Sequence, residues 1–376
     1  MATVSTRYAD TCAALGICLA ANVPVVLWGS PGQGKTSVIA QLARDQGLRL
    51  ETVIASIREP SDFAGLPVVD ALHGTVGFAP PSWARAVEQA GGGVIFFDEM
   101  STAPPSVQAA MLRVAVDRVV GDLTLPEGVR VVAAANPPEE AADGWDLAPP
   151  LANRFCHLSW SLPAEVVRDG FSFGWAPVEV PAAAAKEAGF AAARRLVGAF
   201  LGARPELTSK LPRTATGSGF AFPTPRSWEM AARLYAAAEA AGANASVRFI
   251  LIAGTVGEAA AGEFTTFLGA LDLPDPERLL TDPDHFPMRG RRGDIVYAVA
   301  SSVFAVVRER PSPERWTACG RVLARIAEAG YADIAFATGR RWMAERPTGA
   351  LPDPASLRAL TPILRELGRL LDEDRR

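Results

Sequence analysis

Residues 29–37 read GSPGQGKTS and directly follow the apolar run VPVVLW at 23–28. The order of strand, glycine-rich turn, lysine and threonine matches GxxxxGK[ST], a pattern that holds phosphate groups. Glycines let backbone N–H groups curl around a polyphosphate, and the N-terminus of the following helix adds partial positive charge. A purely structural glycine turn is the alternative, but the strand before and the helix pattern after favour phosphate binding.

Two side chains of this turn are expected to make the specific contacts. Lys35 is one of only three lysines among 37 basic residues, and its ammonium is expected to reach the β- and γ-phosphates. The Thr36 hydroxyl is expected to ligate Mg²⁺. The other expected phosphate-binding positions are Gly29, Ser30, Pro31, Gly32, Gln33, Gly34 and Ser37.

An acidic pair follows the apolar run VIFF at 94–97, which is typical of a buried strand. Acids at the carboxyl end of a parallel strand lie where such sheets bind ligands. Asp98 is expected to hold Mg²⁺, directly or through water. Glu99 is expected to orient and deprotonate the attacking water, because phosphoryl transfer to water needs an aligned nucleophile more than covalent chemistry. A solvated acidic strand end is the alternative.

Three further polar residues are candidates for the same chemistry. Asn136 ends the apolar run VRVVAAAN and is expected either to position the water against the γ-phosphate or to cap a turn before a proline. Arg154, in LANRF, is expected to sense the γ-phosphate from a neighbouring subunit, with a structural surface arginine as the alternative. Arg226 begins a helix pattern in TPRSW, where a solvated first-turn residue is the alternative.

The first 160 residues alternate short apolar runs with helix patterns, which predicts a parallel sheet covered on both faces. After Trp160 the strand signal fades and helix patterns rich in alanine take over. The expected strands are 23–28, 50–56, 94–97, 129–135 and 157–160. The expected helices are 36–45, 83–90, 106–117, 183–203, 226–241 and 246–260, with three or four more after a linker at 272–294.

Composition narrows the classes of partner. A formal net charge of −4 gives no general attraction to nucleic acid or anionic membrane, so a nucleic-acid partner is not expected. The four cysteines show no metal-ligand spacing, which indicates a reduced, cytoplasmic chain that uses them as small apolar residues. The uncharged stretch 11–34 contains Asn22, Pro24 and several glycines, so neither a signal peptide nor a membrane span is expected.

Taken together, GSPGQGKTS, FFDE followed by PPSVQAAML, AAANP, LANRF and TPRSW resemble the AAA+ ATPases, and more narrowly the MoxR family, over about residues 5–265. The resemblance implies that these segments are Walker A, Walker B, sensor 1, the arginine finger (Arg154) and sensor 2 (Arg226). It also implies ATP as the nucleotide, a homo-oligomeric ring that is usually hexameric, and ATP-driven remodelling of proteins. A partner with a von Willebrand factor A domain is common in that family.

The implied fold is an α/β P-loop NTPase of the AAA+ type, a three-layer sandwich with a parallel five-stranded sheet. Its expected parts are a large nucleotide-binding domain at 1–162, an α-helical lid at 163–270, and a linker with a helical C-terminal extension at 271–376. The extension lies outside the resemblance. A ring of this kind needs Arg154 to act in trans, so an isolated subunit is expected to be poorly active.

The chain departs from the MoxR pattern directly after Glu99. The family usually continues the acidic pair with Asn-Arg, whereas Met100, Ser101 and Thr102 follow here. Arg113 or Arg118 is a possible substitute for the missing arginine. The family also carries a pore-facing insertion at the position of 58–67, where Phe63 and Leu66 are candidates for contacting a substrate and a plain surface turn is the alternative.

The residues therefore favour an ATP-hydrolysing MoxR-type ring motor that acts as a chaperone-like remodelling or maturation factor for a protein partner. A nucleotide-gated assembly scaffold is the alternative from another class. A nucleic-acid-directed motor is a third reading, which the acidic charge and the few lysines disfavour.

Overall fold

The computed structural model describes residues 4–70, 72–137, 140, 145–175, 187–212, 219–270, 273–354, 356 and 358–360. The chain divides into two compact units. The first comprises Met1–Phe190 with Leu207–Glu263, and the second comprises Ala191–Glu206 with Phe264–Arg376. The domain boundaries expected at 163 and 271 stay predictions. Within the described ranges, no helix combines the length and the apolar character that crossing a membrane requires.

A five-stranded parallel sheet forms the centre of the first unit, as the sequence predicts, and the α/β class is confirmed. Its order is β2–β5–β8–β1–β9, with every neighbouring pair parallel. Parallel neighbours need a crossover, and the helices between the strands supply it. The strands are β1 (Val25–Trp28), β2 (Leu50–Ile54), β5 (Gly92–Asp98), β8 (Gly128–Ala135) and β9 (Cys156–Ser159).

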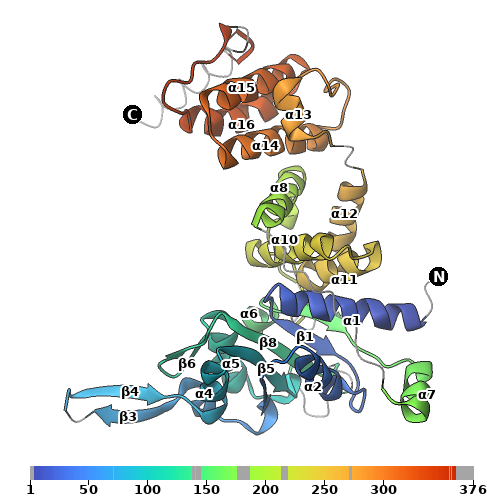
Figure 1. Ribbon diagram of the computed structural model, residues 1–376, viewed down its shortest axis with the longest axis vertical. Coiled ribbons are helices and arrows are strands. Elements are labelled where there is room, and N and C mark those ends of the chain that lie inside the picture. The colour runs from blue at the N-terminus through green and yellow to red at the C-terminus, as the bar shows by residue number, and fades with distance from the viewer. Residues whose placement is uncertain are drawn as a thin grey trace. The chain divides into compact units, whose positions relative to one another are not determined.

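Helices cover both faces of this sheet (Figure 1). One face packs against α1 (Val4–Ala20), α2 (Lys35–Asp45), α10 (Pro225–Ala240) and α11 (Ala245–Val256). The other packs against α4 (Ser82–Gln89), α5 (Pro105–Val116) and α6 (Pro149–Ala152). The unit also contains α3 (Ser61–Ala64) and α7 (Ala164–Phe173), and α12 (Glu258–Gly269) begins in it.

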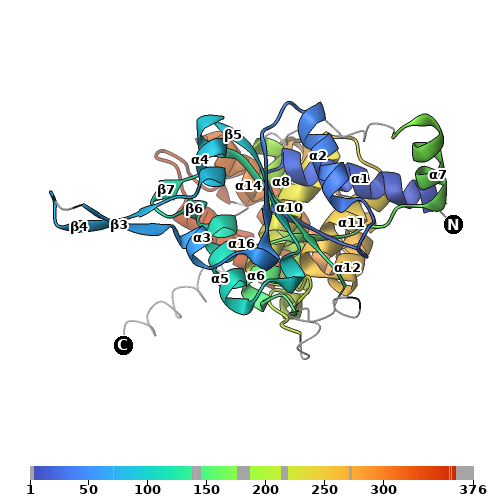
Figure 2. The ribbon, with the colours of Figure 1, turned by 90° about the horizontal axis from the view of Figure 1, so that it is seen from below.

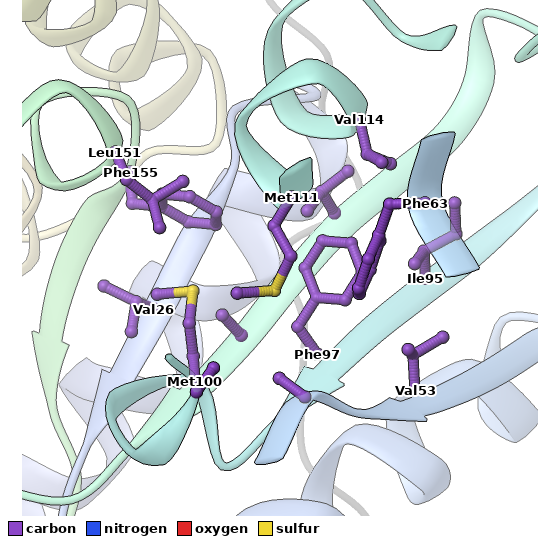
Figure 3. Close-up of a cluster of buried hydrophobic side chains, with 14 of the residues drawn as sticks. Val26, Val53, Phe63, Ile95, Phe97, Met100, Met111, Val114, Leu151 and Phe155 are labelled. Carbon is purple, nitrogen blue, oxygen red and sulfur yellow. The ribbon is translucent and has the colours of Figure 1, made fainter. Parts of the chain in front are cut away.

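Each central strand supplies side chains to both apolar cores, since successive residues point to opposite faces. Phe96 belongs to the core under α1 and α2, whereas Phe97 belongs to the core under α5, and both are fully buried. Figure 3 shows the second core, where Phe97 lies close to Phe63 and Met111. Burial on both faces explains why these strands read as nearly continuous apolar runs.

The edge strand β9 is closed off by helix α11. A Cβ atom at Gly254 would lie 2.6 Å from the His157 carbonyl oxygen and 2.7 Å from the Cys156 sulfur, so only glycine allows this approach. On the opposite side, the Trp28 indole N–H donates to Nδ1 of His157 at 2.9 Å. Nε2 of His157 then donates to the Ala152 carbonyl at 2.9 Å, which fixes a neutral ring. Trp28, Cys156 and His157 therefore have structural roles beside the edge strand.

Two small hairpins were not predicted. The hairpin of β3 (Leu66–Asp70) and β4 (Thr75–Ala79) exposes nearly all its residues, and the second pairs β6 (Val119–Val120) with β7 (Leu123–Thr124). They are joined at the base, where the Asp122 backbone N–H donates to the Phe78 carbonyl at 2.9 Å and the Asp122 carboxylate accepts from the Phe78 N–H. Figure 2 shows β3 and β4 extending away from the sheet.

One expectation for this region is wrong. Phe63, a candidate for contacting substrate, is only 1% exposed and packs edge-on against Phe97 with ring centroids 5.9 Å apart. Its burial follows from its place in α3, which turns it onto the sheet. Leu66, the other candidate, is 64% exposed at the start of the hairpin.

The second unit is helical. Its core is shared by α13 (Pro276–Thr281), α14 (Gly293–Glu309), α15 (Pro313–Glu328) and α16 (Ala332–Ala344), and the unit also contains most of α8 (Glu187–Ala203). Trp316 and Trp342 stack with ring centroids 4.1 Å apart, and each indole N–H donates to the other residue's carbonyl. These paired hydrogen bonds satisfy both buried indoles. The expected C-terminal segment 361–376 lies outside the described residues.

The buried, neutral state of His157 predicts that the free energy of unfolding decreases at acidic pH. Burial lowers the pKa of His157 to about 4, from an ordinary value of 6.5. Between these values the unfolded chain binds a proton that the folded chain resists, so the free energy of unfolding falls as the pH falls. The slope reaches about 1.4 kcal/mol per pH unit. Denaturant titrations between pH 7.5 and 4 should show a shallower decline for His157→Gln than for the parent.

The control is His285→Gln, which removes an exposed histidine from the second unit. It should keep the parent's slope. If His157→Gln shows the parent's dependence of stability on pH, the loss of stability at acidic pH does not come from His157.

Candidate functional site

The phosphate turn is shaped by close backbone packing and by left-handed glycines. A Cβ atom at Gly29 would lie 2.3 Å from the Trp160 carbonyl oxygen. Only glycine therefore fits at this position, where the chain leaves β1. Gly34, at φ 69°, forms the N-cap of α2. Its left-handed conformation turns the chain into the helix at the point where backbone N–H groups become free for an anion.

Lys35 is the first residue of α2 and is almost fully buried. Its ammonium donates to the carbonyls of Gly29 and Ser30, and to Oδ1 of Asn136 at 3.0 Å. Burial lowers the pKa of Lys35, while the negative charges of Asp98 and Glu140 act in the opposite direction. The cation is thus held by exchangeable polar partners, and phosphate oxygens can replace them.

The two predicted Mg²⁺ ligands lie next to each other. The Thr36 hydroxyl donates to Oδ2 of Asp98 at 2.8 Å, which joins the start of α2 to the end of β5. A hydroxyl and a carboxylate are hard oxygen donors, and Mg²⁺ is usually bound by one or two such groups together with phosphates and water. The residues present therefore fit the ion.

Glu99 adopts a left-handed backbone conformation, with φ 56°, directly after the buried strand β5. This region is uncommon for residues other than glycine and is typical of functional sites. Its carboxylate accepts a hydrogen bond from the hydroxyl of Ser56, which lies just after β2. The carboxylate of this candidate base is therefore hydrogen-bonded by the segment that follows the adjacent strand β2.

Asn136 follows β8, and its side-chain oxygen accepts from Lys35. Its backbone N–H donates to the Ser101 hydroxyl at 3.0 Å. The amide thereby faces the phosphate turn, whereas its backbone is tied to the segment behind Glu99.

A cavity of about 380 Å³ brings these groups together. It is lined by Pro31, Gly32, Gln33, Gly34, Lys35, Thr36, Ser37, Asp98, Glu99, Ala134 and Asn136. Most of the predicted site residues thus surround one space at the carboxyl ends of parallel strands, the usual ligand position in such sheets.

Arg154 and Arg226 do not line this cavity. Arg154 lies just after α6, where one of its Nη groups donates to the Pro150 carbonyl and its buried Nε has no hydrogen-bond partner among the described residues. Burial lowers the pKa of Arg154, the nearby charge of Arg226 lowers it further, and Asp117 acts against both. Neither arginine therefore lines the cavity formed by its own chain, and the positive charge of Arg226 acts on Arg154.

Four residues that support the site were not predicted from the sequence: Trp160, Leu162, Ser56 and Ser101. The Gln33 carbonyl accepts from the Trp160 indole at 2.8 Å, and its side-chain oxygen accepts from the Leu162 N–H at 3.0 Å. Ser56 and Ser101 contact Glu99 and Asn136 from separate segments. Such contacts join positions far apart in the chain, and no local pattern marks them.

The arginines offered as substitutes for the missing family arginine differ in their surroundings. The Arg118 guanidinium donates to the carbonyls of Pro126 and Val129 at 2.6 and 2.8 Å, so it braces the turn after β7. Arg113 is exposed on α5.

A second cavity of about 890 Å³ lies in the same unit between α1, β9 and α11. Trp160 forms part of its wall and also contacts the phosphate turn through Gln33. Aromatic residues including Tyr8, Phe220 and Phe249 give it a mixed aromatic and polar lining.

In comparison with known families, residues 24–155 match the AAA domain, dynein-related subfamily. This range covers the phosphate turn, the acidic pair and the segment up to α6. The match to an AAA domain agrees with the P-loop NTPase fold of the first unit.

Three curated relatives match a similar part of the chain. They are the pathogenicity locus regulatory protein WtsA of Pantoea stewartii, the transcriptional regulatory protein XylR of Pseudomonas putida, and the C4-dicarboxylate transport transcriptional regulatory protein DctD of Rhizobium meliloti. Their identities are 27%, 31% and 34%, over 31%, 35% and 30% of this chain. The chain spans only 38%, 24% and 26% of the respective relatives.

Among solved structures, a candidate ATPase from Cytophaga hutchinsonii is similar with a TM-score of 0.43 and 18% sequence identity. The match covers 69% of this chain and 88% of that one.

The environment of Lys35 predicts the effect of removing it. Lys35→Ala should reduce affinity for a fluorescent ATP analogue at least about 100-fold, because charge-assisted bonds to phosphate are lost inside a buried turn. The control is Lys210→Ala, which removes an exposed lysine from a loop of the same unit. Parental affinity in Lys35→Ala would rule out phosphate binding at this turn.

Proposed function

We propose that the chain is an ATP-hydrolysing, MoxR-type ring motor that remodels or matures a protein partner, a proposal supported by the match of residues 24–155 to an AAA domain. The observation that carries this proposal is the convergence of Lys35, the pair Thr36–Asp98, and Glu99 on one cavity. These are the groups that phosphoryl transfer to water requires: a cation that binds the phosphates, a metal site and a base.

In this proposal the phosphate turn holds ATP and orients its γ-phosphate. Lys35 exchanges its carbonyl partners for phosphate oxygens, and the N-terminus of α2 adds its backbone N–H groups. Thr36 and Asp98 hold Mg²⁺, which neutralises charge on the phosphates when bound. The aromatic cavity beyond Trp160 is the proposed place for the base of the nucleotide.

Glu99 is the proposed general base and Asn136 the residue that positions the water. For Glu99 to accept a proton from water, its carboxylate must release the Ser56 hydroxyl or share it. Asn136 already lies beside the Lys35 ammonium and so close to the γ-phosphate position. The two groups approach from neighbouring strands, β5 and β8, and can contact one water.

Arg154 and Arg226 are proposed to complete the site of a neighbouring subunit. They form a cationic pair that a triphosphate in another subunit would neutralise, and neither lines the cavity of its own subunit. An arginine supplied in this way stabilises charge that develops in the transition state and raises the rate of hydrolysis about 10³–10⁵-fold. This dependence supports a homo-oligomeric ring, for which we propose a hexamer.

The exposed hairpin of β3 and β4 is the proposed contact with the protein substrate. Val69 is 72% exposed and Leu72 is 92% exposed, although both are apolar. Exposed apolar clusters mark interaction surfaces. A partner with a von Willebrand factor A domain completes the proposal by family resemblance, and the four buried free cysteines support a cytoplasmic location.

A nucleotide-gated scaffold is the second candidate, and the Ser56–Glu99 hydrogen bond favours it. If that bond persists with ATP bound, the base stays engaged and hydrolysis acts only as a timer. Steady-state ATPase measurements on the assembled ring distinguish the two functions, since a motor turns over continuously.

Glu99→Gln separates nucleotide binding from hydrolysis. It preserves the shape of the side chain and the Thr36–Asp98 pair but removes the base, so ATP binding should stay near parental. Hydrolysis should fall about tenfold or more, with a longer-lived oligomer. The control is Glu88→Gln, which removes a partly exposed carboxylate from α4. Hydrolysis near the parental rate in Glu99→Gln would remove Glu99 from this role.

Arg154→Ala tests action between subunits. Each variant subunit should still bind ATP but hydrolyse it poorly, because its neighbour lacks the arginine. Mixing Arg154→Ala with Glu99→Gln subunits should raise activity above either variant alone, since some interfaces then combine an intact base with an intact arginine. Fluorescence energy transfer between labelled subunits verifies exchange, and Arg321→Ala, exposed on α15, is the control.

The opposite result is also informative. A monomeric subunit that hydrolyses ATP at the full rate and still needs Arg154 would show that the arginine acts within its own chain. The ring mechanism would then be wrong.

A further inference from the structure

Ser101 is a buried polar residue that joins three separate segments of the AAA domain. It lies two residues after Glu99, in a single 3₁₀ turn (Met100–Thr102), and is only 2% exposed. Its hydroxyl accepts the Asn136 backbone N–H at 3.0 Å, and its carbonyl accepts the Trp145 N–H at 2.7 Å. A buried serine with two such contacts fixes the relative positions of its neighbours.

The first contact sets the position of the Asn136 amide. Asn136 follows the last residue of β8, and Pro137 after it has no N–H to continue a ladder. The Ser101 hydroxyl therefore anchors the last backbone donor of this strand end. From that anchored backbone, the Asn136 side chain reaches the Lys35 ammonium at 3.0 Å.

The second contact connects the same turn with the approach to α6. Trp145 is fixed through the Ser101 carbonyl, and three residues later the Ala148 N–H donates to the buried side chain of Gln108 at 2.9 Å. Helix α6 starts at the next residue, and Arg154 follows its end. The segment that carries the arginine is thus tied to the turn behind Glu99.

We propose that Ser101 is a positioning residue for ATP hydrolysis: its hydroxyl holds the Asn136 amide in register with the Glu99 carboxylate, so that both act on one water. This inference rests on the proposed ATPase function. Ser101 does not line the phosphate cavity, so it acts through Asn136 and leaves the binding of the nucleotide to the phosphate turn.

The test compares Ser101→Ala, Ser101→Thr and the parent protein by steady-state ATPase kinetics and by binding of a fluorescent ATP analogue. Ser101→Ala removes the acceptor for the Asn136 N–H, and kcat should fall about tenfold, equal to about 1.4 kcal/mol in the barrier. KM and nucleotide affinity should stay within about twofold of the parent, because they depend on the phosphate turn. Ser101→Thr keeps a hydroxyl and should recover most of kcat.

Thr255→Val is the matched control for the loss of a buried hydroxyl. Thr255 is 1% exposed, and its hydroxyl donates to the Ile252 carbonyl within α11, away from the cavity. Both variants can lower the thermal midpoint, but only Ser101→Ala should lower kcat. If Ser101→Ala does not fold, Ser101→Cys, which has similar volume and a weak acceptor, makes the same comparison with Ser101→Thr.

A double-mutant comparison checks that Ser101 acts through Asn136. Ser101→Ala combined with Asn136→Ala should be no slower than Asn136→Ala alone, because the amide to be positioned is already gone. Multiplicative losses would overturn the inference, and so would parental kcat in Ser101→Ala or an equal loss in Ser101→Thr. A parent that hydrolyses no ATP as an assembled ring would instead overturn the proposed function itself.

Discussion

The parallel pairing of five buried strands is the constraint on which the site depends. With every neighbour parallel, the strands end at the same edge of the sheet, and the polar residues after β1, β5 and β8 must meet there. The apolar runs before those ends lock the register, because a slip of one residue would exchange the two cores. Phe96 and Phe97 show this, since each occupies a different core. The chemistry at the edge is therefore positioned by packing in the interior.

The sequence was sufficient for the sheet and for the residues at its carboxyl edge. The central strands β1, β5 and β8 are mostly apolar runs, and the phosphate turn, the acidic pair and Asn136 each follow such a run directly. Local order thus encodes both the element and the site residue. Helices α2, α4 and α5 were predictable for a similar reason, since their apolar positions recur with the period of a helix.

What the sequence did not predict depends on contacts between distant segments. Ser56 and Ser101 are ordinary serines until folding brings them to Glu99 and Asn136. The exposed hairpin was missed because its apolar residues do not alternate with polar ones as in a half-buried strand. Phe63 was misplaced for a related reason: a turn of helix in α3 directs it onto the sheet, although the surrounding segment is polar.

The joined hairpins have a mechanical consequence. Two strands alone are marginally stable in water, so the ribbon of β3 and β4 depends on its attachment at the base. There Asp122 holds Phe78 by two hydrogen bonds, and the Gly121 N–H donates to the Phe63 carbonyl at 3.3 Å. These hydrogen bonds thus hold the ribbon at its base, away from its tip. A force applied near its tip therefore acts on residues 121–122, which β7 connects along the chain to β8 and Asn136.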